Sequence, residues 1–228
     1  MRGFLRYGIY VVPDGPFHAA GATWLGWDSA TGARVTQPDV AGLPYPAATL
    51  TATPRKYGIH GTIKPPFRLA DGTDAEGLGA ALGAFCAGQP PVLVPSLTLR
   101  RLGRFLALVP EAPVPALARL AAGAVQDLDA FRAPLSAAEL TRRRKSRLSD
   151  RQEAMLQRWG YPHVMEEFRF HITLTGSLEE AALAPVETAL AGHFAPVLGQ
   201  PLVIEDLALM GEDEDGMFHL LHRYALTG

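Results

Sequence analysis

The chain has 228 residues, of which 48% are hydrophobic and 19% charged, a composition typical of a globular protein and not of a disordered chain or a coiled coil. Its 21 Lys and Arg residues against 23 Asp and Glu give a net charge of −2, so no overall basic field exists to hold long nucleic acid. The single cysteine, Cys86, excludes an internal disulfide and a cysteine-based metal site.

Nothing in the sequence predicts attachment to a membrane. No apolar run approaches the roughly 18 residues that a membrane span needs. Residues 1–7 interrupt their short apolar stretches with arginine, which is unlike a signal peptide. We therefore expect a cytoplasmic protein with no membrane partner, and we favour a monomer.

The first half of the chain predicts alternating strands and helices. A strand over residues 7–12 ends at a proline and precedes a short helix over 16–27. Residues 28–56 are rich in Pro, Gly, Thr and Ala, and a loop of this length is usually functional or mobile. A strand over 57–63 follows and is closed by a proline pair. Next come a helix at 74–87 and two strands joined by a tight turn, at 92–100 and 104–110.

The second half begins with helical periodicity over residues 114–131 and again over 136–158. Ser149 is a plausible N-cap inside the second stretch, and Gly160 is a plausible stop. A strand, a helix and two further strands complete the chain, at 168–174, 179–194, 202–210 and 217–224.

Two tetrapeptides share the pattern His-x-Thr-aliphatic, namely residues 60–63 and residues 171–174. Each opens the same predicted order of strand, helix, strand and strand, which ends in a strand that contains Phe105 in the first copy and Phe218 in the second. One such short pattern occurs often by chance. Two copies in matching contexts indicate an internal duplication.

Strand geometry predicts what the tetrapeptides present. Side chains alternate between the two faces of a strand, so His60 shares a face with Thr62, and His171 shares one with Thr173. A pseudo-twofold between the copies would bring both pairs into one cleft. The opposite faces carry apolar residues that we expect to pack under helices: Ile59, Ile63, Phe170, Ile172 and Leu174.

This arrangement suits the cleavage of a phosphodiester. A neutral imidazole can take a proton from the attacking water, and a protonated imidazole can give one to the leaving oxygen. The hydroxyls of Thr62 and Thr173 can hydrogen-bond the non-bridging phosphate oxygens. No metal or other cofactor is required, and the remaining histidines lack the spacing of a zinc site. The sequence leaves open whether His60 or His171 is the base.

The paired motifs resemble those of the two-histidine (2H) phosphoesterase superfamily, which includes the 2′–5′ RNA ligase-like proteins and cyclic phosphodiesterases. Segments 6–10, 54–67 and 159–176 resemble a narrower bacterial branch linked to phosphonate metabolism. The resemblance implies a bilobal α+β fold in which antiparallel sheets line a central cleft and helices lie outside. It also implies one domain over residues 1–228, with cofactor-free hydrolysis of a phosphodiester, often a cyclic one. A helical insertion at about 132–160 exceeds the minimal scaffold of that superfamily.

Four further residues are candidates for substrate binding. Lys64 follows Thr62 by two positions, on the same face of an unbroken strand, and could contact the phosphate. Tyr57 and Arg55 could line the rim of the cleft, although Tyr57 points away from His60 if the strand is regular. Tyr10 could stack on a base or sugar, and the alternative is that it covers the edge of the core.

The leading hypothesis is a metal-independent phosphodiesterase that acts on a small cyclic phosphodiester, either a nucleoside 2′,3′-cyclic phosphate or a sugar cyclic phosphate. The alternative is a protein that binds or processes RNA ends. In that case the basic run at residues 142–147 would grip the RNA; otherwise this run is a solvated helix end. Phosphate-binding glycine loops and a Gly-x-Ser-x-Gly nucleophile elbow are absent from the sequence.

Overall fold

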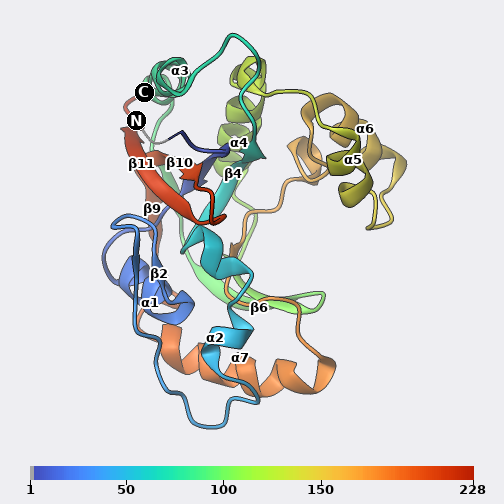
Figure 1. The fold of residues 1–228 in the computed structure, drawn as a ribbon. Helices are drawn as coiled ribbons and strands as arrows, with labels where there is room; N and C mark the ends of the chain where they lie inside the picture. The colour runs from blue at the N-terminus through green and yellow to red at the C-terminus, as the bar shows by residue number, and fades with distance from the viewer. Residues whose placement is uncertain (1–2) are drawn as a thin grey trace.

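Figure 1 shows the computed structural model of the chain, which describes residues 3–228, so the first two residues of the arginine-interrupted N-terminus lie outside the described part. The main sheet has seven strands in the order β11-β10-β1-β4-β8-β7-β6, and all neighbours are antiparallel. The predicted α+β class with antiparallel strands is therefore confirmed. The strands of this sheet are β1 (Arg6–Val11), β4 (Gly61–Phe67), β6 (Leu97–Leu102), β7 (Phe105–Pro110), β8 (Ile172–Thr173), β10 (Asp206–Glu212) and β11 (Phe218–Ala225).

Two small antiparallel sheets and a set of helices surround the main sheet. One small sheet pairs β2 (Trp27–Asp28) with β3 (Ala33–Arg34), and the other pairs β5 (Val92–Val94) with β9 (Leu202–Ile204). In Figure 1, α3 and α4 lie at one end of the sheet, α1 and α7 at the other, and α5 and α6 to one side. The helices are α1 (Gly15–Leu25), α2 (Ala47–Leu50), α3 (Ala75–Ala87), α4 (Pro115–Asp127), α5 (Ala137–Arg143), α6 (Asp150–Trp159) and α7 (Glu180–Phe194), with 3₁₀ turns η1 (Pro54–Tyr57), η2 (Asp129–Phe131) and η3 (Met165–Glu167). None of the helices within residues 3–228 combines the length and apolar character needed to cross a bilayer.

The internal duplication has different boundaries from those predicted. The first repeat runs β1-α1-β4-α3-β5-β6 and the second runs β7-α4-β8-α7-β9-β10, because exchanging these sets leaves the order β10-β1-β4-β8-β7-β6 unchanged. β7 is thus the counterpart of β1, and β11 is an added edge strand. The predicted equivalence of the strands that contain Phe105 and Phe218 is wrong, because two consecutive hairpins look alike in sequence although their strands have different neighbours.

The two repeats are interleaved. The last strand of each repeat pairs with the first strand of the other, since β6 pairs with β7 and β10 with β1. The second helix of each repeat packs on the strand that the other repeat contributes: α3 packs on β10 and on the added strand β11, and α7 packs on β6 and on β7 of its own repeat. One apolar core therefore contains residues of both repeats. The apolar residues predicted behind the motifs are all buried in it: Ile59, Ile63, Phe170, Ile172 and Leu174.

Both motif strands begin later than predicted. Strand β4 begins only at Gly61, because residues 54–57 form η1 and Gly58 follows with a φ of 70°, and it continues through the proline pair that was predicted to close it, as far as Phe67. Strand β8 consists of Ile172–Thr173 alone and is preceded by η3. Because each strand begins directly after the histidine of its motif, that histidine lies at the point where the chain enters the sheet.

The predicted insertion forms two helices in place of one. Helices α5 and α6 each begin with a capping box, on Ser136 and Ser149, so the predicted N-cap at Ser149 is confirmed. Gly160 ends α6 with a φ of 72°, as predicted. The segment 28–56, which the composition predicted as a loop, contains β2, β3, α2 and the start of η1.

Candidate active site

The two motifs meet at the centre of the sheet. Gly61 on β4 pairs with Ile172 on β8 in antiparallel register. One residue further in each direction, this register sets His60 across from Thr173 and Thr62 across from His171. Gly61 makes the contact possible, because a Cβ atom there would lie 2.3 Å from the ring of Phe170. The local twofold axis passes between Gly61 and Ile172.

Both histidines are held in the same way. The Nδ1 of His60 lies 3.0 Å from the carbonyl oxygen of Gly58, and the Nδ1 of His171 lies 2.8 Å from that of Arg169. A carbonyl oxygen only accepts, so each Nδ1 carries the proton and donates it to the residue two positions earlier. Each ring therefore keeps Nε2 available for chemistry.

The environment of His60 favours the neutral imidazole. Burial lowers its pKa from 6.5 to about 4; the hydrogen bond to Gly58 opposes this shift, and the nearby charge of His171 adds to it. Its ring packs at a tilt against Tyr10 and Tyr57, with centroid distances of 4.3 and 5.3 Å. Tyr57 in turn stacks on Phe218 at 4.7 Å. His60 therefore lies in an aromatic pocket.

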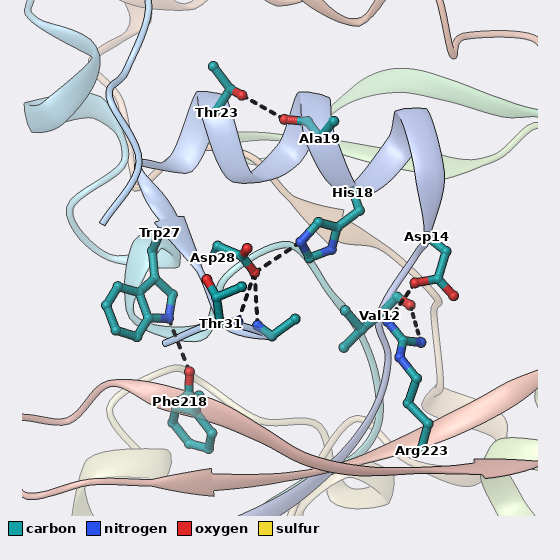
Figure 2. A network of polar contacts seen from close by, with 11 residues as sticks. Val12, Asp14, His18, Ala19, Thr23, Trp27, Asp28, Thr31, Phe218 and Arg223 are labelled. Atoms are coloured by element: carbon teal, nitrogen blue, oxygen red, sulfur yellow. Dashed lines mark hydrogen bonds and ion pairs between the residues drawn. The ribbon is translucent and has the colours of Figure 1, made fainter. Parts of the chain in front are cut away.

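Neighbouring segments fix these aromatic residues. The indole of Trp27 donates to the carbonyl oxygen of Phe218 at 3.1 Å, as Figure 2 shows, and so ties β2 to the start of β11. A Cβ atom at Gly58 would lie 2.9 Å from the hydroxyl of Ser29, so the backbone that accepts from His60 packs directly on this segment. Figure 2 also shows Asp28 accepting from His18 and from the turn that follows.

A cavity of about 450 Å³ opens beside the motifs. His171 lies next to this cavity and is not among the residues that line it. The lining residues are Arg6, Tyr10, Thr53, Pro54, Tyr57, His60, Thr62, Pro65, Pro66, Arg142, Arg143, Tyr161 and Thr173. The structure thus brings together one histidine, both threonines and both tyrosines among the sequence candidates.

Corresponding segments of the two repeats build the walls. In each repeat the chain between the first helix and the motif strand is long, namely residues 26–60 and 128–171. The first segment contributes Thr53, Pro54 and Tyr57, and the second contributes Arg142, Arg143 and Tyr161. The irregular segment and the basic run that stood out in the sequence therefore face each other across the motifs.

The prediction that Lys64 contacts the phosphate is wrong. The register between β1 and β4 shifts between the pairs Ile9–Lys64 and Tyr10–Thr62, so a bulge turns Lys64 to the opposite face. Its ammonium group is buried, donates to the carbonyl of Val125 at 3.1 Å and lies 3.5 Å from Asp129. Burial lowers its pKa to about 8. Lys64 thus anchors α4 to the sheet.

The prediction that Arg55 lines the rim is also wrong. Its guanidinium group donates to the carbonyl oxygens of Leu25 and Ala48 and to the hydroxyl of Thr51. It is absent from the cavity lining, and it holds the first wall segment together.

Arg6 and Tyr161 are among the lining residues that the sequence did not indicate as site residues. Arg6 shares a strand face with Gly8 and Tyr10, and this alternation is the signal that could have found it. The Tyr10 ring lies over Gly8, where a Cβ atom would be 2.9 Å from the phenol. Tyr161 directly follows Gly160, where the helix ends, and no comparable sequence pattern indicates that it lines the cavity.

Metal ligands do not gather here. Across residues 3–228, no group of three or more His, Cys, Asp or Glu side chains is arranged as a metal site.

The model of a family described as "Protein of unknown function (DUF1045)" matches residues 62–219. The chain belongs to the DUF1045 family. The matched range contains the second motif complete and Thr62 of the first.

Two curated relatives of this DUF1045 protein are both named "Ribose 1,5-bisphosphate phosphokinase PhnN". The one from Janthinobacterium sp. (strain Marseille) is 40% identical over 218 residues, which are 92% of this chain and 48% of the relative. The one from Laribacter hongkongensis (strain HLHK9) is 34% identical over 214 residues, with 93% and 49% covered. The chain thus spans about half the length of the curated relatives it matches.

Solved structures similar to this DUF1045 protein include one described as "Crystal structure of phosphoesterase". It has 16% sequence identity and a TM-score of 0.49, with 99% of this chain and 100% of that one covered. Two structures of E. coli LigT, complexed with phosphate and with 3′-AMP, have 13% and 16% identity, and both have TM-scores of 0.47. The first comparison covers 99% of both chains, and the second covers 98% of both.

Proposed function

We propose that this protein is a metal-independent two-histidine phosphodiesterase that hydrolyses a small cyclic phosphodiester. The observation that carries the proposal is the antiparallel pairing of the two motifs, in which each histidine faces the other motif's threonine and keeps its Nε2 free. Two imidazoles and two hydroxyls on directly paired strands suit an in-line displacement at phosphorus.

In the proposed mechanism His60 is the base and His171 the acid. The lowered pKa of His60 keeps it neutral at pH 7, so its Nε2 can accept a proton from the attacking water. The bound phosphodiester anion raises that pKa and strengthens the base. As the new phosphorus–oxygen bond forms, the bond to the leaving sugar oxygen breaks, and His171 protonates that oxygen. Thr62 and Thr173 hydrogen-bond the non-bridging oxygens.

The proposed substrate is a cyclic phosphate on a sugar. The curated relatives are named for a kinase of ribose 1,5-bisphosphate, and this chain matches only about half of them. No Gly-x-x-x-x-Gly-Lys-Ser/Thr phosphate loop occurs in its sequence, so the kinase name does not describe the chemistry of this half. Opening a cyclic phosphate on ribose yields a ribose phosphomonoester, the compound class in that name. A nucleoside 2′,3′-cyclic phosphate is the competing substrate.

The test follows the products by phosphorus NMR. EDTA-treated protein is incubated with the four nucleoside 2′,3′-cyclic phosphates and a ribose 1,2-cyclic phosphate. We expect turnover of at least one compound, and a loss of about 10³-fold or more in His60→Ala and in His171→Ala. His222→Ala, a change at an exposed histidine on β11, serves as the matched control and should keep full activity. Turnover that persists in both motif variants would refute the mechanism.

A further inference from the structure

An arginine cluster occupies the part of the cavity away from the motifs. Arg6 lies four residues before Tyr10 on β1, about 13 Å along the strand. Arg142 and Arg143 reach the same cavity from the last turn of α5, together with Tyr161. Glu212 pairs with Arg6 through both carboxylate oxygens and neutralises that charge. Two positive charges remain.

These two charges have no acidic partner in the described chain. Within residues 3–228, neither Arg142 nor Arg143 takes part in an ion pair, and neither guanidinium group donates a hydrogen bond to protein. The Nε of Arg143 is buried and unpartnered, and its guanidinium group lies 4.9 Å from the ring centroid of Tyr161. The neighbouring Arg144, by contrast, pairs with Glu153.

A buried N–H that donates to nothing is costly, because it loses hydration and gains no partner, and the Nε of Arg143 is such a group. The burial of Arg143 accordingly lowers its pKa from the ordinary value. The alternative is that these arginines only stabilise the C-terminal turn of α5 through the helix dipole. It explains neither the buried Nε nor the position of both residues in the cavity wall.

A second buried polar group points to a ligand in the same cavity. Tyr10 is fully buried, and its hydroxyl has no hydrogen-bond partner among the described residues. Its ring extends from His60 back over Gly8, so it connects the motif end of the cavity with the arginine end. Burial raises the pKa of Tyr10 well above its usual value, so the phenol stays protonated and remains a donor.

We propose that Arg142 and Arg143 form a second phosphate subsite, which binds a terminal phosphate monoester of the substrate. Two arginines match the dianion in charge and present forked donors to its oxygens. The cavity of about 450 Å³ suits a sugar that carries two phosphates and not a longer nucleic acid. The inference of this subsite depends on the proposed function in one respect, namely that the phosphodiester bound at the motif end of the cavity is the group that reacts.

The first test measures binding alone. Ribose 5-phosphate, which contains no phosphodiester, is titrated calorimetrically into the wild type, with ribose as the uncharged comparison. We expect ribose 5-phosphate to bind and ribose not to, and we expect Arg143→Ala and the exposed Arg142→Ala each to weaken binding about tenfold or more. Arg144→Ala, at the adjacent position on the same segment, is the matched control and should leave the affinity for ribose 5-phosphate unchanged.

The second test is kinetic and separates the two proposals. A cyclic phosphodiester is compared with the same compound carrying a terminal phosphate, and Arg143→Ala should lower kcat/KM about tenfold or more only for the phosphorylated form. Equal binding of ribose and ribose 5-phosphate, or equal effects of the changes at Arg143 and Arg144, would overturn the subsite. Tighter, Arg143-dependent binding of a 5′-phosphorylated RNA would overturn the sugar phosphate as its ligand. Arg143-dependent binding of ribose 5-phosphate without turnover of any phosphodiester would refute the proposed phosphodiesterase activity and would leave the phosphate subsite supported.

Discussion

The packing of His60 against two tyrosines makes its titration a direct probe of the site. Its pKa is about 4 in the folded protein and 6.5 in the unfolded chain, so the unfolded chain takes up the proton first as the pH falls. Above about pH 6.5 the imidazole of His60 is neutral in both the folded and the unfolded protein, so its titration does not lower the free energy of unfolding. Between about pH 6.5 and 4 the protein loses about 3 kcal/mol of stability on its account.

The prediction is that His60→Asn removes this loss. Free energies of urea unfolding, measured from pH 7 to pH 4, should fall less steeply in the variant than in the wild type. His163, whose pKa burial also lowers, is present in both proteins and cancels in the difference. Identical slopes would mean that His60 is exposed to solvent and titrates normally.

The alternation of side chains between the two faces of a strand correctly predicted the faces of most motif residues. It failed where the strand is irregular. His60, Thr62 and Thr173 follow the simple rule, because the register holds across the central pair. Lys64 breaks it through a bulge that depends on pairing with β1, a strand some 50 residues away, so no local pattern reveals it. The contacts of Arg55 depend equally on the packing of α1 and α2 against its own segment.

Among the elements, the contact between β4 and β8 depends on one missing side chain. A Cβ atom at Gly61 would meet the Phe170 ring at 2.3 Å, and backbone pairing on both sides prevents an easy shift. Gly61→Ala should therefore lower the free energy of unfolding by about 1–3 kcal/mol and reduce activity by displacing the motifs. Chemical denaturation and the phosphorus NMR assay measure the two effects.

A second substitution that relieves this clash provides the control. Adding Phe170→Leu to Gly61→Ala should recover part of the loss, because the smaller side chain leaves room for the new methyl group. Gly192→Ala, in α7, meets no atom within 4 Å and should stabilise the helix by up to about 1 kcal/mol. A Gly61→Ala protein as stable as the wild type would show that the strands are not in this close contact.

Element types were predictable wherever the periodicity was long. Helices α1, α3 and α7 agree with prediction because the apolar residues that each helix buries lie within a single segment of the chain. The strands β4 and β8 were predicted to begin too early, because the residues between each strand and the 3₁₀ turn before it include β-branched and aromatic types that strands favour, namely Ile59, Phe168 and Phe170. Only the tertiary contacts of those turns, such as that between Gly58 and Ser29, decide between the two conformations.

At the scale of the whole molecule, the two repeats depend on each other. Each repeat places its last strand at the edge of the other's pair of strands, where the second helix of that other repeat packs on it. The sequence shows that a duplication exists, but strand partners separated by a hundred residues or more leave no local trace. A repeat boundary in the hairpin between β6 and β7 therefore looks like the middle of a repeat.

This interleaving predicts a single cooperative unfolding transition. Leu82 in α3 and Leu190 in α7 are both fully buried in the core that the repeats share. Leu82→Ala and Leu190→Ala should each lower the midpoint of one transition by an amount that corresponds to about 2–5 kcal/mol. Far-ultraviolet circular dichroism and the fluorescence of the buried Trp24 should report the same curve in each variant. Two resolved transitions, with only one of them moved by each substitution, would mean that the halves fold independently and that the exchanged strands add little to stability.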